Sequence, residues 1–184
     1  MIRTLIFIVL GAALFIAIAV TGYNFATTRT HSPLEEKTFN AGDLDLKVTY
    51  CRPYKKGRLI FGTENDGALV PYNKYWRLGA NDATEITFSL PVTFAGNPIA
   101  AGSYRMYAVP GPELWEISLN SELGKFGAYP PDYTLDVLKV MVPVNQIDEM
   151  SEQFTIDFSN DSTGVIMAFI WDKTVVNIPI RQNI

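Results

Sequence analysis

The chain has 184 residues, of which 48% are hydrophobic, and its formal net charge is −4. A disordered chain could not carry so many apolar residues, and the roughly 155 residues after a hydrophobic N-terminus are enough for one domain with its own core. The acidic balance also argues against general nucleic-acid binding, because that function needs a broad basic face to neutralise phosphates.

The N-terminal segment is the first predicted element. Residues 4–28 are uncharged and residues 5–20 are continuously apolar, and a membrane crossing needs about 20 mostly apolar residues. We therefore expect residues 1–28 to be either a signal anchor, with one transmembrane helix that contacts the membrane through residues 4–25, or a cleaved signal peptide. The length of the run favours the anchor, whereas Ala17-Ile18-Ala19 would suit cleavage.

Positive charges flank this run unequally. Arg3 and the terminal amine precede it, and the next basic residue, Arg29, comes well after it. This asymmetry predicts a cytoplasmic N-terminus and an exported domain. The expected arrangement is a single-pass membrane protein whose domain lies outside the cytoplasm.

A polar linker is expected over residues 29–38, and a β domain over residues 39–184. In residues 43–50 apolar and polar side chains alternate perfectly, which predicts a strand with one buried face. Similar alternation predicts further strands, and more continuous apolar runs predict central or closing strands. The alternating segments are residues 85–90, 103–109, 114–119 and 153–159, and the apolar ones are residues 137–142, 165–171 and 175–180.

Turn residues separate these segments at the spacing of a meander or Greek key, as in residues 96–98, 110–112, 160–164 and 172–173. The pattern predicts an all-β fold, an antiparallel two-sheet sandwich that is jelly-roll-like. Helix is expected only in short pieces beyond the N-terminal segment, at residues 73–77 and 145–150.

The charges are distributed unevenly along the domain. Residues 47–77 contain seven basic and two acidic residues, whereas residues 78–184 contain five basic and thirteen acidic residues. A site that recognises a ligand is therefore expected within residues 50–85.

Several motifs in this basic stretch resemble one bacterial family, the domain of unknown function 2911. The resemblance starts with Tyr50-Cys51-Arg52-Pro53 and continues through residues 56–62, 69–72 and 76–86. Later matches are residues 101–104, 109–111, 127–129 and 154–158, together with Trp115. The chain differs from the family pattern at Cys51, where serine is usual, and in the extra residues 63–68. The resemblance implies an exported β-rich bacterial domain and implies no activity. The expected location is therefore the bacterial inner membrane, as a single-pass protein whose domain lies on the periplasmic side.

Three arginines in the basic stretch are candidate ligand contacts, since guanidinium groups bind carboxylates, phosphates and sulfates through paired donors. Arg52 and Arg58 flank a turn, and Arg77 follows an indole that could contact a flat or sugar-like body. The full predicted set is Arg52, Arg58, Trp76, Arg77, Asn81, Thr84 and Glu85. The alternative is that the arginines pair with the chain's own carboxylates and that Trp76 belongs to the core.

Catalysis and metal binding have few candidate residues. His31 is the single histidine and lies in the expected linker, which excludes a Ser-His-Asp triad, a Cys-His pair or a His-ligated zinc site in the domain. Cys51 lacks a base, and Glu85, Glu116 and Asp157 show no spacing typical of a carboxylate pair. We predict no metal and no cofactor.

Two functions remain open. The first is a membrane-anchored module that binds a small anionic or glycan ligand at the Arg/Trp cluster, and the second is a non-catalytic accessory subunit of a membrane or envelope complex. The aromatic and Pro-rich residues 124–131 would cover the site in the first case or dock a partner in the second.

Overall fold

The computed structural model describes residues 2–182, apart from the side chains of residues 2–6, 8–9 and 24–26. The chain divides into two units, a helix and a β domain that begins at Ser32.

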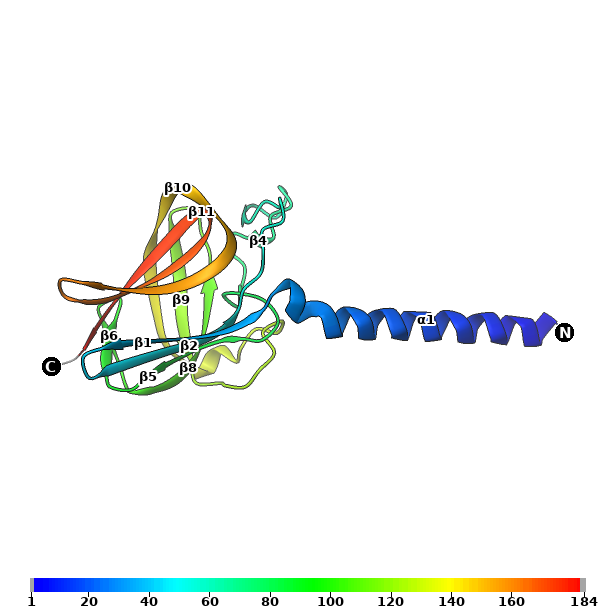
Figure 1. Cartoon of the computed structure of the whole chain (residues 1–184), viewed down its shortest axis with the longest axis horizontal. Helices are drawn as coiled ribbons and strands as arrows, with labels where there is room; N and C mark the ends of the chain where they lie inside the picture. Colours follow the sequence, from blue (N-terminus) through cyan, green and yellow to red (C-terminus); the bar gives the residue numbers. More distant parts are fainter. Residues whose placement is uncertain (1, 183–184) are drawn as a thin grey trace. The chain divides into compact units, whose positions relative to one another are not determined.

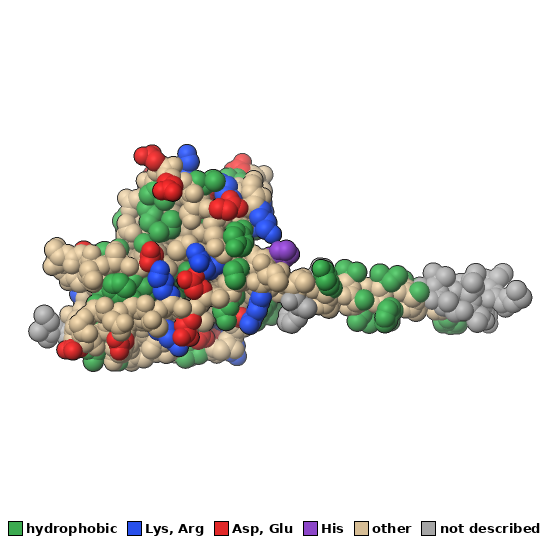
Figure 2. Space-filling view, in the orientation of Figure 1, with side chains coloured by type: hydrophobic (Ala, Val, Ile, Leu, Met, Phe, Trp, Pro, Cys, Tyr) green, Lys and Arg blue, Asp and Glu red, His purple; other side chains and the backbone are tan. Residues whose placement is uncertain are grey.

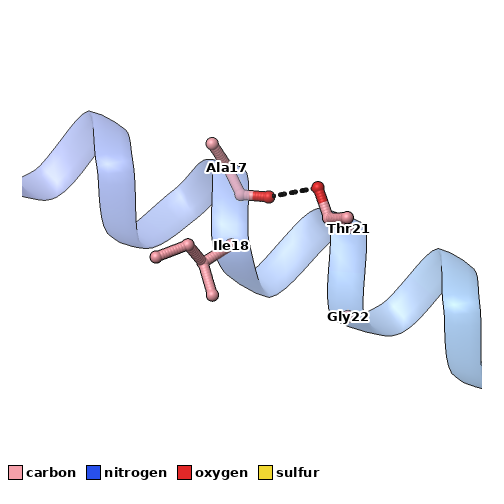
Figure 3. Close-up of a pocket in the computed structure, with 4 residues that line it drawn as sticks. All are labelled: Ala17, Ile18, Thr21 and Gly22. Atoms are coloured by element: carbon pink, nitrogen blue, oxygen red, sulfur yellow. Dashed lines mark hydrogen bonds between the residues drawn. The ribbon is translucent and has the colours of Figure 1, made fainter.

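The helix α1 spans Ile2–His31. Its last turn carries Arg29, whose positive charge suits the negative end of the helix dipole, and Pro33 follows two residues after the helix ends at His31. Thr21 donates a hydrogen bond from Oγ1 to the Ala17 carbonyl at 2.8 Å (Figure 3). Within the described part of α1, no segment is both long and apolar enough to cross a membrane.

Among residues 2–182, nine strands form one antiparallel sheet in the order β1-β2-β5-β8-β9-β10-β11-β6-β7 (Figure 1). The mostly β, antiparallel architecture that the sequence predicts is thereby confirmed. The strands are β1 (Leu34–Ala41), β2 (Leu44–Cys51), β5 (Thr84–Phe88), β6 (Val92–Phe94), β7 (Asn97–Ile99), β8 (Gly102–Val109), β9 (Leu114–Asn120), β10 (Asp136–Asp161) and β11 (Gly164–Gln182). A separate parallel pair, β3 (Phe61–Gly62) and β4 (Val70–Pro71), and a short 3₁₀ helix, η1 (Tyr133–Leu135), complete the domain.

The sheet bends through β10, which pairs first with β9 and then with β11. The bend brings the second half of β10 to the inner face of β1 and β2. Tyr50 accepts a hydrogen bond at its hydroxyl from the Ile156 amide at 2.9 Å, and Phe39 stacks on Phe158 with ring centroids 5.6 Å apart. The core therefore lies between two parts of one continuous hydrogen-bonded sheet.

Aromatic rings fill one part of this core. Trp76 is buried and contacts four other rings at centroid distances of 5.0–6.0 Å, those of Phe61, Trp115, Phe154 and Trp171. Such edge-to-face and stacked pairs bury much apolar area, so this cluster holds together segments that are distant in the sequence.

The structure differs from the predictions where backbone pairing decides the conformation. Residues 145–150, expected as a helix, lie within β10. Residues 73–77, also expected as a helix, begin at a turn with Asn73 at a φ of 61° and continue to a β-bridge between Trp76 and Ala108. The turn expected at residues 172–173 lies inside β11, where Asp172 has a φ of 55° and pairs with Ser151 at an irregular point of the ladder. In each case the backbone N–H and C=O groups form hydrogen bonds through strand pairing or at a bulge, in place of those within the predicted helix or turn.

Residues 29–38, expected as a linker, are divided between α1 and β1. β1 pairs with β2 along its whole length, from Leu34 opposite Cys51 to Ala41 opposite Leu44. Its charged residues, Glu35, Glu36 and Lys37, suit an edge strand, because charge on an edge opposes pairing with other chains.

Candidate ligand site

Two of the predicted arginines are engaged with their own chain. Arg52 pairs with Glu35 at 2.7 Å and donates to the Phe154 carbonyl and the Thr155 hydroxyl at 3.2 and 2.8 Å. Arg58 is exposed, and it donates to the carbonyls of Tyr54 and Lys55. Arg52 therefore attaches the end of β2 to β10, and Arg58 closes the turn in which it lies.

Three other predicted residues have structural contacts. Trp76 belongs to the aromatic core, and its Nε1 donates to the Gly79 carbonyl at 3.2 Å. Thr84 is fully buried and donates to the Leu78 carbonyl at 2.7 Å. Glu85 accepts a hydrogen bond from the Gly124 amide at 2.7 Å. The structure thus places Trp76 and Thr84 inside the fold and Glu85 against a loop that follows β9.

Arg77 and Asn81 lie together under the same loop. Arg77 donates to the Asn81 carbonyl at 3.2 Å, and no described carboxylate forms an ion pair with its guanidinium. Burial lowers the pKa of Arg77, whereas Tyr75 and Cys51 oppose this effect and the nearby Arg105 adds to it; an arginine guanidinium keeps its charge in proteins. Asn81 has a φ of 54°, and its Nδ2 is buried without a hydrogen-bond partner.

We call residues 122–130 the covering loop. Its backbone is attached to the segment between Tyr75 and Glu85 by four hydrogen bonds. In two of them the loop donates: the Gly127 amide donates to the Asn81 carbonyl at 2.8 Å, and the Gly124 amide donates to the Glu85 carboxylate at 2.7 Å. In the other two the loop accepts: the Lys125 carbonyl accepts from the Ala83 amide at 3.1 Å, and the Gly127 carbonyl accepts from the Tyr75 hydroxyl at 3.0 Å. Two of the predicted ligand contacts, Asn81 and Glu85, therefore position this loop, and Arg77 donates to the same Asn81 carbonyl.

Gly127 allows the covering loop to lie close to Arg77 and Ala83. A Cβ atom at this position would be 2.7 Å from Cδ of Arg77 and 3.0 Å from the Ala83 amide nitrogen. Cβ atoms essentially never approach a neighbour so closely, so only glycine fits without displacing the arginine or the loop.

Arg105 is the residue that sequence reasoning missed. It lies on β8 beneath the covering loop, with a relative exposure of 1%. Its guanidinium pairs with Glu122 at 3.1 Å and donates to the Tyr75 hydroxyl at 2.7 Å and to the Tyr129 carbonyl at 2.5 Å. The Nε–H group is also buried, and it has no hydrogen-bond partner.

Tyr75 contacts Arg105 through both its hydroxyl group and its ring. The arginine lies over its ring at 5.9 Å from the centroid, a geometry in which the ring face attracts a cation. Burial raises the pKa of the Tyr75 hydroxyl, although hydrogen bonding and charge interaction with Arg105 oppose this. The phenol therefore stays neutral at ordinary pH and can accept from Arg105 while donating to Gly127.

A cavity of about 250 Å³ lies between Arg105 and the covering loop. It is lined by Arg105, Glu122, Lys125, Phe126, Tyr129 and Pro130. Lys125 is 3.5 Å from Glu122 and keeps about half of its side chain exposed. The cavity thus combines two cations, one carboxylate and two aromatic rings, and its composition suits a small anion with an apolar part.

Several other charged residues of the domain form ion pairs. Figure 2 shows basic and acidic side chains interspersed on one face of the domain. Lys37 pairs with Asp157 at 2.5 Å and Lys47 with Glu36 at 3.0 Å. The basic stretch of the sequence therefore does not form a continuous basic surface on the face seen there.

The other reactive side chains also have partners. Cys51 is buried, with Sγ 4.0 Å from a carboxylate oxygen of Asp82. Glu116 lies 3.8 Å from Lys139, so the three carboxylates considered for catalysis, Glu85, Glu116 and Asp157, each contact a donor in the domain. Within the described residues, no three His, Cys, Asp or Glu side chains gather closely enough to hold a metal ion.

One signal in the sequence pointed toward Arg105. Residues 103–109 alternate, so Tyr104, Met106 and Ala108 mark one face and Arg105 the other. The alternation could not show that a loop beginning 17 residues later, at Glu122, covers that other face.

Comparison with known proteins places the chain in a family without assigning a role to any residue. No curated protein and no solved structure matches it. A family model described as "Protein of unknown function (DUF2911)" matches residues 32–180, which is most of the chain and nearly all of the β domain. The chain therefore belongs to the DUF2911 family, as the motifs around the basic stretch predicted.

Proposed function

We propose that the protein is a membrane-anchored, extracytoplasmic binding module that binds a small anionic or glycan ligand over Arg105. In this proposal its β domain is a jelly-roll-like two-layer sandwich. The observation that carries this proposal is the buried guanidinium of Arg105, which lines a cavity and has an Nε–H group without a partner.

The energetics of burial support an anion at this position. A buried donor without an acceptor costs about 1–3 kcal/mol, and more for a charged group. Glu122 supplies one carboxylate to Arg105, and Lys125 brings a second cation to the cavity. A bound anion in the cavity would compensate the second positive charge.

The residues first predicted as ligand contacts fit this proposal as positioning residues. Asn81 and Glu85 hold the covering loop, Arg77 donates to the Asn81 carbonyl, and the loop contributes five of the six residues that line the cavity. Arg52, Arg58, Trp76 and Thr84 hold other parts of the fold in place.

Binding is testable with the full-length protein in detergent. Acetate, phosphate, sulfate and glucuronate would be titrated by isothermal calorimetry against the native protein and two charge variants. Lys125→Gln removes the exposed cation of the cavity, and Lys74→Gln is the matched control, because Lys74 is similarly exposed and lies 3.4 Å from Glu64 outside the cavity. We expect Lys125→Gln alone to weaken anion binding. Absence of binding to every anion would refute the proposal.

The membrane anchor rests on the sequence of residues 4–25, which includes side chains outside the described part of α1. A cysteine at Ser162, an exposed position in the turn between β10 and β11, would report its orientation. Because Cys51 is buried, the native chain gives the background. We expect a membrane-impermeant maleimide to label Ser162→Cys in intact spheroplasts; labelling only after lysis would contradict the periplasmic location.

An accessory subunit of a membrane or envelope complex is the second candidate. Small side chains recur every four residues at Ala13, Ala17 and Thr21, and Ala17, Ile18, Thr21 and Gly22 line a hollow on α1 (Figure 3). Small residues at this spacing let two membrane helices approach closely. Purification from membranes in mild detergent tests this function: a stable larger complex that Ala17→Leu disrupts would favour the subunit over the isolated module.

A further inference from the structure

We infer that the ligand over Arg105 is a sugar acid, a single hydroxylated ring that carries one carboxylate. This inference rests on the proposed function and adds the chemical class of the ligand. Three properties of the cavity support it: its net charge, its aromatic side chains and its size.

The charge of the cavity favours a single negative charge on the ligand. Arg105 and Lys125 are cationic, and Glu122 lies within 3.5 Å of both. One carboxylate from the ligand would compensate the excess cation, whereas a phosphate carrying nearly two charges would also face Glu122 at close range. Arg105 and Lys125 line the cavity, and guanidinium and ammonium groups are the usual partners of a carboxylate.

The carboxylate of Glu122 gives the ligand a second requirement. One of its oxygens accepts from Arg105 at 3.1 Å, and the other lies 3.5 Å from Lys125, too far for a strong hydrogen bond. A carboxylate oxygen with free lone pairs accepts hydrogen bonds from hydroxyl groups. A ligand with hydroxyls next to its carboxylate would therefore satisfy both Arg105 and Glu122.

Aromatic rings at the cavity favour a ring in the ligand. Phe126 and Tyr129 line the cavity, and they keep 45% and 75% of their surface exposed. Exposed aromatic rings that have no role in the core form a contact surface of low entropic cost. The C–H face of a sugar ring carries a slight positive charge that suits the electron-rich face of an aromatic ring.

The size of the cavity limits the ligand to one ring. Its volume of about 250 Å³ is close to the lower end of the roughly 300–1,000 Å³ typical of small-molecule pockets. At about 30 Å³ for each water molecule, the cavity has room for about eight waters. A monosaccharide fits this space, and any further units of a glycan would extend into solvent.

The test compares four probes on the full-length protein in detergent: glucuronate, glucose, acetate and inorganic phosphate. We expect glucuronate to bind at least about tenfold more tightly than the other three. Tyr129→Ala leaves the backbone carbonyl that binds Arg105 in place, and it should weaken glucuronate binding by roughly 3–10-fold, the usual effect of one aromatic contact. Tyr133→Ala is the control, since Tyr133 is an exposed aromatic residue that does not line the cavity.

The outcomes separate this inference from the proposed function. If phosphate or acetate binds as tightly as glucuronate and Tyr129→Ala has no effect, the site binds anions but the sugar-acid inference is wrong. If glucose binds as tightly as glucuronate, the carboxylate has no role and the inference is also wrong. If none of the probes binds, the proposed function itself fails.

Discussion

Replacing Tyr75 with phenylalanine would test how Arg105 and the covering loop are held. The change removes one hydroxyl that accepts from Arg105 at 2.7 Å and donates to the Gly127 carbonyl at 3.0 Å, and it keeps the ring beneath the guanidinium. A hydrogen bond to a charged group contributes about 1.5–3 kcal/mol and a neutral one about 0.5–1.5 kcal/mol. Because the two bonds share one oxygen and the loop can relax, we expect a loss of about 2–3 kcal/mol, below the simple sum.

The assay is urea and thermal unfolding of the full-length protein in detergent, with Tyr104→Phe as the matched control. The Tyr104 hydroxyl makes one exposed hydrogen bond, to the Ala100 carbonyl at 3.0 Å, so its loss should cost no more than about 1 kcal/mol. For a chain of this size, 2–3 kcal/mol lowers the Tm by on the order of 4–12 °C. The amide of Gly127 should also exchange faster with solvent in Tyr75→Phe. If Tyr75→Phe were no less stable than Tyr104→Phe, Arg105 and the loop would not depend on this hydroxyl.

Three further predictions concern the backbone, the pH dependence and the anchor. Gly79 has a φ of 146°, and a Cβ there would lie 2.5 Å from the Cys51 carbonyl oxygen, whereas a Cβ at Gly42 would meet nothing within 4 Å. In urea unfolding, Gly79→Ala should therefore lose at least about 2 kcal/mol more free energy of unfolding than Gly42→Ala. Equal losses would contradict the close approach of Gly79 to Cys51. Burial raises the pKa of Asp157, but hydrogen bonds from Lys37 and the Phe158 amide outweigh it and the net pKa is lowered. The stabilisation from Asp157 is therefore complete above its unfolded pKa of about 3.9 and is lost as the pH falls through the folded-state pKa. The urea midpoint of Asp157→Asn should accordingly fall less between pH 7 and pH 3 than that of the native chain or of Asp43→Asn, and identical slopes would count against the Lys37 contact. Leu14→Arg should release the protein from carbonate-washed membranes while Leu14→Ala should not, because a central arginine costs roughly 2.5–3.5 kcal/mol of insertion; retention of both variants would argue against the anchor.

Strands with a clear apolar–polar alternation were predictable because this signal is local. In β2 the alternation of apolar and polar residues directly reports which side chains face the core, and Leu44, Leu46, Val48 and Tyr50 are all buried. The same reasoning placed β5, β8 and β9 within one or two residues of their observed ends. The helix expected at residues 145–150 was wrong because the pairing of β10 with β9 and β11 overrides weak local preferences.

The candidate site was only partly predictable. The motif between Tyr75 and Glu85 was identified from its residues, but their roles depend on the covering loop, which reaches them from about 40 residues further along the chain, as in the Gly124 contact with Glu85. The uneven distribution of charge along the sequence suggested that Arg52 contacts a ligand. Arg52 instead pairs with Glu35 in β1, a strand that the sequence did not predict.

The family, the mostly β class and the positions of the longer alternating strands could be inferred from the order of residues, because they depend on motifs and on a period of two along the chain. The position of the cavity could not. Arg105 is buried only because Tyr75, Glu122 and Tyr129 come from separate segments to satisfy it. Such a network forms when β8, the segment after β4 and the covering loop pack together, since the cost of burying a guanidinium is met by partners that no local pattern specifies.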